Sequence, residues 1–202
     1  MLYSELQCSD AIHKAVERMG FAEMTEIQEK TIPVMLAGHD VIAKAPTGTG
    51  KTCAFGIPVV EHIQPENKYP QAVIMAPTRE LAQQIAEELT NLTYFMPEVQ
   101  VACVYGGANM EKQAKRLAEG CQIVVATPGR LMDHYKHHSI DISHVTQIVL
   151  DEADEMLNMG FYKDVRHIIE MMKARKSLSM FSATISREVM DIGWLYQHNA
   201  EE

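Results

Sequence analysis

The sequence predicts an α/β protein built on a doubly wound, mostly parallel β-sheet with helices on both faces. From residue 40 onward, short apolar runs alternate with longer stretches of helical periodicity, which is the pattern of repeated βαβ units. The runs are nearly continuously apolar, as expected for strands that are buried on both faces. The chain has 202 residues, of which 47% are hydrophobic, and this suits one domain with a substantial core.

Two helices are expected before the first strand. Residues 9–19 place their apolar side chains on one helical face, and Gly20 can end this helix. A second helix is expected over residues 25–36. Pro33 interrupts the hydrogen bonding of that helix and should kink or shorten it.

The alternating part of the chain then follows. Strands are expected at 40–45, 71–76, 99–105, 121–126, 146–150 and 178–182. Helical patterns lie between and after them, near 52–63, 79–92, 109–118, 129–137, 160–173 and 186–195. Several of the strands run directly into a short polar motif. Because ligands of open α/β sheets bind at the carboxyl ends of the strands, these motifs are expected along one edge.

The first of these motifs predicts a phosphate-binding loop. Ala45-Pro46-Thr47-Gly48-Thr49-Gly50-Lys51-Thr52 lies between a strand and a helix, where backbone N–H groups and a helix N-terminus can cradle phosphates. Lys51 can reach the β- and γ-phosphates, and Thr52 can present its hydroxyl to Mg²⁺. Ala45 replaces the first glycine of the strict pattern. The alternative is an ordinary glycine-rich turn.

The second motif is acidic. Asp151-Glu152-Ala153-Asp154 follows the apolar strand that ends at residue 150, and a buried acid is costly unless it is paired or binds metal. Beside a phosphate loop, Asp151 fits a partner of Mg²⁺, directly or through a water. Glu152 fits the group that orients or deprotonates the attacking water. Lys51, Asp151 and Glu152 are therefore the candidate catalytic residues; the alternative is an acidic helix start that complements the helix dipole.

The order of the motifs resembles a known family. The phosphate loop is followed by Pro77-Thr78-Arg79-Glu80-Leu81-Ala82, Gly106-Gly107, Thr127-Pro128-Gly129-Arg130, Asp-Glu-Ala-Asp at 151–154 and Ser182-Ala183-Thr184, and it is preceded by a Gln motif at 20–28. This series is similar to the first RecA-like domain of the DEAD-box RNA helicases, over essentially the whole chain. The resemblance implies a RecA-like P-loop NTPase domain spanning residues 1–202, with 1–29 as the Q-motif region and 30–202 as the α/β core.

The resemblance also implies how ATP is recognised. Gln28 would read the adenine, since a Gln amide can pair with both N6–H₂ and N7, and Tyr3 would stack on the base. Thr25-x-x-Gln28 is equally a helix capping box, and this alternative remains open. The expected nucleotide contacts are Tyr3, Gln28, Pro46, Thr47, Gly48, Thr49, Gly50, Lys51 and Thr52, with ATP and Mg²⁺ as ligands and Thr52 and Asp151 as the metal partners.

A second set of residues would bind RNA. By resemblance, the backbone of single-stranded or duplex RNA would be contacted without sequence preference by Pro77, Thr78, Arg79, Gly107, Thr127, Gly129 and Arg130. Asp154, Ser182 and Thr184 would couple nucleotide state to RNA binding. The net charge is −9, whereas nucleic-acid-binding domains usually carry a basic balance. RNA binding by this chain alone is therefore expected to be weak.

The family uses two RecA-like domains, and the arginine pattern that marks the second is absent from this sequence. We therefore expect an ATP-dependent RNA helicase represented by its ATP-binding domain, poorly active without the second domain. The alternatives are a catalytically silent nucleotide-dependent binding module and a motor acting on DNA. No apolar run approaches the length of a membrane span, and the four cysteines form no C-x-x-C pair. A cytoplasmic monomer is expected.

Overall fold

A computed structural model describes residues 1–46, 50–198 and 200. Its centre is a six-stranded sheet in the order β1-β6-β5-β2-β4-β3, in which every neighbouring pair is parallel. The strands are β1 (Ile42–Lys44), β2 (Ala72–Met75), β3 (Val101–Val104), β4 (Ile123–Ala126), β5 (Gln147–Asp151) and β6 (Ser177–Ser182). All six expected strands are confirmed, with shorter bounds at most of their ends.

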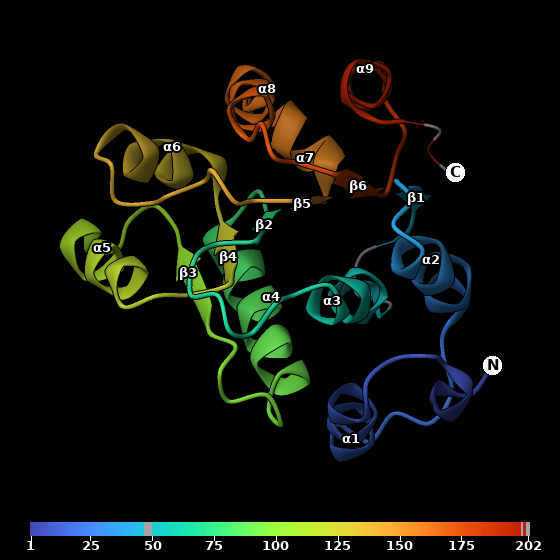
Figure 1. The fold of residues 1–202 in the computed structure, drawn as a ribbon. Coiled ribbons are helices and arrows are strands. Elements are labelled where there is room, and N and C mark those ends of the chain that lie inside the picture. The colour runs from blue at the N-terminus through green and yellow to red at the C-terminus, as the bar shows by residue number, and fades with distance from the viewer. Residues whose placement is uncertain (47–49, 199, 201–202) are drawn as a thin grey trace.

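Helices cover both faces of the sheet, as the continuous apolar runs predict. In Figure 1, α3 and α4 lie below the strands, and α6, α7 and α8 lie above them. The helices are α1 (Asp10–Arg18), α2 (Glu26–Leu36), α3 (Lys51–Glu61), α4 (Arg79–Leu92), α5 (Met110–Ala118), α6 (Pro128–Lys136), α7 (Ala153–Asn158), α8 (Tyr162–Met171) and α9 (Arg187–Tyr196), and a 3-10 turn spans Tyr3–Glu5.

The strands divide their side chains between two apolar clusters. Ile74 belongs to the cluster beneath α1 to α4, while its neighbours Val73 and Met75 belong to the cluster beneath α5 to α9. This alternation is the period of two of a β-strand, and both sets are fully buried. Behind the start of α3, Phe55 packs on Phe181 with ring centroids 5.3 Å apart. The phosphate-loop helix is thus anchored to β6, the neighbour of the edge strand β1.

Two local expectations need revision. α2 continues past Pro33 to Leu36, so the proline does not shorten the helix. Pro33 is exposed, while Ile32 and Met35 are buried against the core, and this packing offsets the lost hydrogen bond. The short helix α7, which starts at Ala153, was not expected as a separate element; the acidic motif supplies its first turn.

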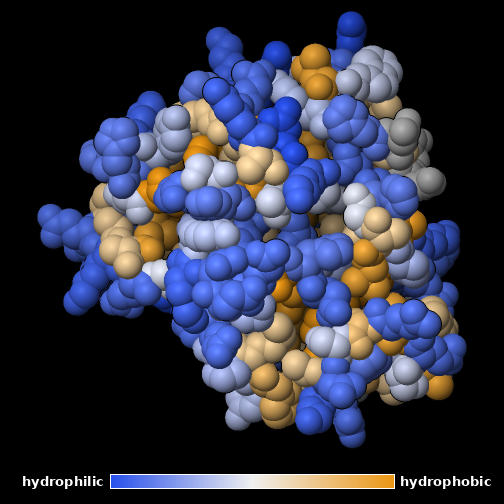
Figure 2. Space-filling model, viewed as in Figure 1, coloured by the Kyte–Doolittle hydropathy of each residue, from blue (hydrophilic) through white to orange (hydrophobic). Residues whose placement is uncertain are grey.

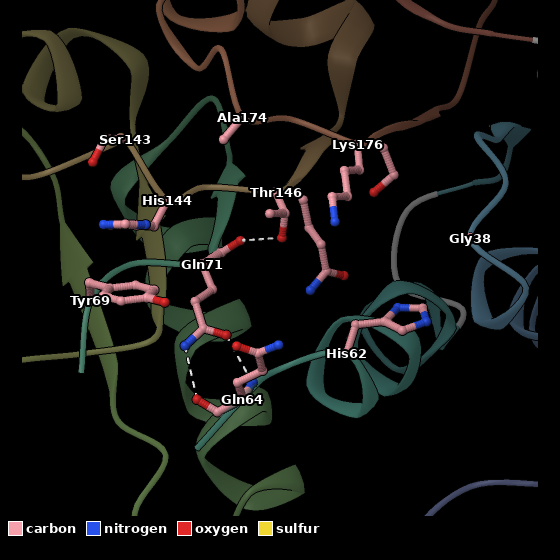
Figure 3. A pocket seen from close by; sticks show the side chains of 12 residues that line it. Gly38, His62, Gln64, Tyr69, Gln71, Ser143, His144, Thr146, Ala174 and Lys176 are labelled. Atoms are coloured by element: carbon pink, nitrogen blue, oxygen red, sulfur yellow. Dashed lines mark hydrogen bonds between the residues drawn. The ribbon is translucent and has the colours of Figure 1, made fainter. Parts of the chain in front are cut away.

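Polar side chains at the amino edge of the sheet stabilise loops. A cavity of about 460 Å³ opens there, lined by residues that precede or begin strands, among them Gln71, Thr146 and Ser177. Figure 3 shows Gln71 reaching toward Gln64; its amide donates to the carbonyl oxygens of Gln64 and Asn67 at 2.9 and 3.0 Å. At this edge the Gln71 amide therefore satisfies loop backbone.

The surface is predominantly polar. Figure 2 shows hydrophilic side chains over most of one face, with smaller apolar patches between them. Within the described residues, no helix has both the length and the apolar character required to cross a bilayer.

Candidate active site

Three polar motifs meet where β1, β5 and β6 end. The backbone N–H of Ala45, which starts the phosphate loop, donates to the carbonyl of Ser182 at 2.9 Å. Asp151 is the last residue of β5, and its register partner on β6 is Phe181, next to Ser182. Because β6 lies between β1 and β5, the expected gathering of these motifs at one edge is observed.

Lys51 is the centre of this cluster. Its ammonium lies 2.9 Å from Asp151 Oδ1 and 3.6 Å from Glu152 Oε2, and the side chain is only 6% exposed. The structure therefore brings together the three predicted catalytic residues. This buried ammonium thus has two carboxylate partners among the described residues.

Asp151 has one oxygen available for a metal ion. The Asp151 side chain is fully buried. Burial is the largest influence on the pKa of its carboxyl and raises this pKa, although Lys51 lowers it. Oδ1 accepts hydrogen bonds, but the buried Oδ2 has no partner among the described residues. An unpaired carboxylate oxygen suits Mg²⁺, a hard cation that keeps several waters and takes few protein ligands.

Glu152 has a strained backbone. Its φ of 49° places it in the left-handed region at the N-cap of α7, which costs a non-glycine residue roughly 1–3 kcal/mol and is concentrated at functional sites. The conformation turns the chain sharply between β5 and α7. As a result the Glu152 carboxylate faces Lys51, while Asp154 faces the end of β6.

Sequence reasoning missed Glu88. Burial raises the pKa of the carboxyl of this half-buried residue of α4, and the nearby Thr52 hydroxyl opposes that rise. A hydroxyl that binds Mg²⁺ through its oxygen needs an acceptor for its proton, and Glu88 can be that acceptor. No motif marks Glu88, because only the packing of α4 on α3 brings it to Thr52.

Gln28 joins the Q-motif region to the phosphate loop. Its side chain and that of Thr25 form the expected capping box. The same amide also donates from Nε2 to the carbonyl of Gly50 at 3.0 Å. Gly50 has a φ of 71°, and an added Cβ would lie 2.6 Å from Gln28 Nε2, so both the conformation and the close approach require glycine. Capping and phosphate-loop contact are therefore made by one side chain.

Tyr3 packs against Phe21 and Gln28. Its ring is 5% exposed, it stacks on Phe21 with centroids 6.3 Å apart, and its hydroxyl donates to Gln28 Oε1. Burial raises the pKa of this phenol. Gln28 Oε1 thus accepts hydrogen bonds from both the Thr25 N–H and the Tyr3 hydroxyl. The Tyr3 hydroxyl would have to release Gln28 Oε1 before an adenine amino group could donate to that oxygen.

The remaining nucleotide contacts are only partly visible. Pro46 follows β1 and is exposed. The predictions for Thr47, Gly48 and Thr49 fall outside the described residues. Gly50 is the N-cap of α3, and Thr52 lies in its first turn with 9% exposure.

The three predicted coupling residues contact one another. Asp154 Oδ2 accepts from the backbone N–H and hydroxyl of Thr184 at 3.1 and 2.9 Å. The Ser182 hydroxyl accepts from the Asp154 N–H at 3.1 Å and donates to the Thr184 carbonyl at 2.6 Å. Burial alone would raise the pKa of Asp154, but the hydrogen bonds from Thr184 and Ser182 outweigh it and lower the pKa. α7 and the end of β6 are thus held together beside the catalytic cluster.

The predicted RNA contacts lie at the ends of β2, β3 and β4. Thr78 is the exposed N-cap of α4, and Thr127 is the N-cap of α6 with Pro128 as the first helical residue. Pro77 and Thr127 are buried, Gly129 and Arg130 are half-buried, and Thr78, Arg79 and Gly107 are exposed.

The two arginines of this set differ. Arg79 lies over the Tyr105 ring, with its guanidinium carbon 4.9 Å from the centroid, and remains exposed. The Arg130 side chain is 13% exposed and donates to the carbonyl of Ala108 and to Gln113. Arg130 therefore supplies less charge to the surface than the sequence suggests. Tyr105 and Gln113 were also missed by sequence reasoning.

Comparisons with known proteins agree with this geometry. Residues 25–192 match the family model described as DEAD/DEAH box helicase. The chain is 48% identical over 201 residues to the ATP-dependent RNA helicase CshA of Limosilactobacillus reuteri. This match covers 100% of this chain and 40% of the relative. It is 40% identical over 200 residues to the ATP-dependent RNA helicase DeaD of Mycobacterium tuberculosis. That match covers 99% of this chain and 36% of the relative. The chain thus spans about two fifths of the length of these relatives.

Solved structures agree as well. A DEAD box protein from Methanococcus jannaschii superposes with a TM-score of 0.91 at 40% identity, over 100% of this chain and 55% of that one. A hypothetical ATP-dependent RNA helicase from Sulfolobus tokodaii superposes with a TM-score of 0.89 at 39% identity. This match covers 96% of this chain and 56% of that one. The predicted RecA-like fold, with its parallel sheet between two layers of helices, is confirmed.

Proposed function

The chain belongs to the DEAD/DEAH box helicase family, and from this premise we propose that it is the ATP-binding RecA-like domain of an ATP-dependent RNA helicase. The observation that supports this most directly is the buried cluster in which Lys51 lies between Asp151 and Glu152. Such an arrangement fits phosphoryl transfer, which depends on positioning and charge stabilisation. In this proposal residues 1–29 form the Q-motif region, 30–202 form the α/β core, and a second RecA-like domain belongs to the working protein.

The residues of the cluster would divide the work. Lys51 exchanges its carboxylate partners for the β- and γ-phosphates of ATP. Thr52 and Asp151 Oδ2 would hold Mg²⁺, directly or through a water, and the bound ion would supply positive charge to the phosphates. Glu152, released from Lys51, orients the attacking water. A second domain completes the site with arginines, a contribution of about a thousandfold or more in phosphoryl-transfer enzymes.

The RNA side of the proposal rests on the residues at the ends of β2, β3 and β4. Helix N-termini at Thr78 and Thr127 suit phosphate groups, and contacts to phosphates and sugars carry no sequence information. Contacts to 2′-hydroxyl groups would favour RNA over DNA. Asp154, Ser182 and Thr184 would transmit nucleotide state to this surface through the end of β6. Cytoplasmic location and a monomeric state remain predictions.

We expect ATP hydrolysis to depend on RNA. Joined to a second RecA-like domain, the chain should hydrolyse ATP faster with single-stranded RNA than with single-stranded DNA or without nucleic acid, while the chain alone hydrolyses slowly in all three. Steady-state phosphate release measures this. Equal rates with and without RNA would favour a binding module, and equal stimulation by DNA would favour a DNA motor.

We expect Gln28 to set nucleotide selectivity. Gln28→Glu keeps the acceptors for Thr25 and Tyr3, and Glu also forms capping boxes, but it loses the donor for Gly50 and for adenine. ATP affinity should fall about tenfold, equivalent to about 1.4 kcal/mol, with GTP affinity changed less. Isothermal titration of both nucleotides measures the ratio. Suppose that Gln28→Glu left the ratio of ATP to GTP affinity unchanged and that Gln28→Ala lowered only thermal stability. Gln28 would then be a helix cap and would not select the nucleotide.

A further inference from the structure

One side chain links the RNA-facing segments of this domain. Gln113 lies on α5, outside every motif of the sequence, and is only 8% exposed. Its Nε2 donates to the carbonyl of Tyr105 at 3.1 Å, immediately before Gly106-Gly107. Its Oε1 accepts from Arg130 Nη1 at 3.0 Å and pairs with His134 Nε2 at 3.0 Å. A single amide thus joins the glycine loop after β3 to the first turns of α6.

Tyr105 extends the network to a third segment. Its ring lies beneath the Arg79 guanidinium, 4.9 Å from the centroid, and its hydroxyl accepts from Gln83 Nε2 at 3.1 Å. Arg79 and Gln83 both belong to α4. The start of α4, the loop at Gly107 and the start of α6 are therefore connected through two residues, Tyr105 and Gln113.

The hydrogens of this network have only one consistent arrangement. Gln113 Oε1 accepts from Arg130, so His134 must donate to it from Nε2. His134 is fully buried, burial lowers the pKa of its imidazole and nearby Arg130 lowers it further, and the contact with Oε1 requires a proton on Nε2. Arg130 Nη1 also donates to the carbonyl of Ala108 at 2.9 Å. The loop at Gly107, whose φ of 86° makes it conformationally permissive, is thus held on both sides.

We infer that Gln113, with Tyr105, is a positioning residue that fixes the segments around Arg79, Gly107 and Thr127 in one arrangement suited to successive phosphates of a single RNA strand. The inference rests on the proposed function. The covalent backbone limits the distance between successive phosphates of one strand, so a surface that already holds its donors within that range loses less entropy on binding. In this role Arg130 holds the surface together, and the backbone amides and Arg79 meet the RNA.

The chain offers a matched control at the opposite edge. Gln122 is fully buried and its amide makes a similar set of bonds, donating to the carbonyl oxygens of Pro65 and Glu98 at 3.0 and 2.9 Å and accepting from the Gln100 N–H at 2.8 Å. Gln113→Met and Gln122→Met should therefore lower thermal stability to a similar extent. Only the first should affect RNA.

The test is the anisotropy of a labelled single-stranded oligouridine, titrated with the 202-residue chain at several low salt concentrations. Gln113→Met should weaken binding about fivefold to tenfold, as expected for losing one or two hydrogen bonds. It should also flatten the dependence of affinity on salt, because fewer phosphates are contacted. Gln122→Met should leave both unchanged. Gln113→Glu, which keeps the acceptor for Arg130 but opposes the Tyr105 carbonyl, should weaken binding as well.

Three results would overturn this assignment. Wild-type affinity and salt dependence in Gln113→Met, or wild-type affinity in Gln113→Glu, would show that the amide only stabilises the fold. Equal weakening by Gln122→Met would point to general destabilisation. A wild-type chain that bound no oligouridine at any salt concentration would instead overturn the proposed function, and the inference with it.

Discussion

Glu152→Gln is expected to stop ATP hydrolysis while leaving ATP binding in place. The variant keeps the size of the side chain and the backbone at φ 49°, but it removes the carboxylate that would orient and deprotonate water. Loss of a general base lowers rates by about 10²- to 10⁴-fold. Lys51 still has Asp151 at 2.9 Å, so folding should be little affected. Single-turnover hydrolysis and nucleotide titration, in a protein with both RecA-like domains and RNA, measure the two properties separately.

Glu155→Gln is the matched control for this variant. Glu155 lies three residues further along the same acidic helix start and is exposed to solvent, so its loss changes the helix charge without touching Lys51. It should hydrolyse ATP at the wild-type rate. If Glu152→Gln hydrolysed ATP as fast as Glu155→Gln, the acidic motif would serve only the helix dipole, and the catalytic role of Glu152 would be wrong.

The sequence predicted the strands, the fold and the edge at which the motifs gather, because each depends on local patterns. Continuous apolar runs predict buried parallel strands, and the polar residues that follow them must lie at the carboxyl edge. Gln28 shows the limit of such reasoning. Its spacing from Thr25 predicts the cap, but its bond to the Gly50 carbonyl depends on how α2 packs beside α3, which no local pattern contains.

Glu88, Tyr105 and Gln113 were missed for the same reason. Each lies on a helix or directly after a strand where the sequence shows no motif, and each has a partner distant in the chain. Arg130 shows a second limit. Its place in a motif suggested a free cation, whereas the structure places its side chain against Ala108, Gln113 and Asp133. Charge alone could not distinguish a phosphate contact from an internal one.

Lys51→Met is expected to remove nucleotide binding and also to destabilise the fold. Asp151 is fully buried, and its ammonium partner is 2.9 Å away. Removing one member of a buried pair leaves an uncompensated charge, which costs about 3–5 kcal/mol of the free energy of unfolding. Urea denaturation at pH 7 measures this cost, and nucleotide titration measures binding. A variant as stable as wild type would mean that water or another cation already compensates Asp151.

Asp151→Asn in the Lys51→Met background separates the two effects. Replacing both members of a buried ion pair by neutral groups of similar size is often neutral or stabilising, so the double variant should recover most of the lost stability. It should not recover ATP binding, because the phosphates still lack Lys51 and Mg²⁺ still lacks the Asp151 carboxylate. Recovery of both would mean that Lys51 serves mainly to neutralise Asp151. Recovery of stability alone would assign the ammonium two roles, with Asp151 holding it in place until phosphate oxygens replace the carboxylate.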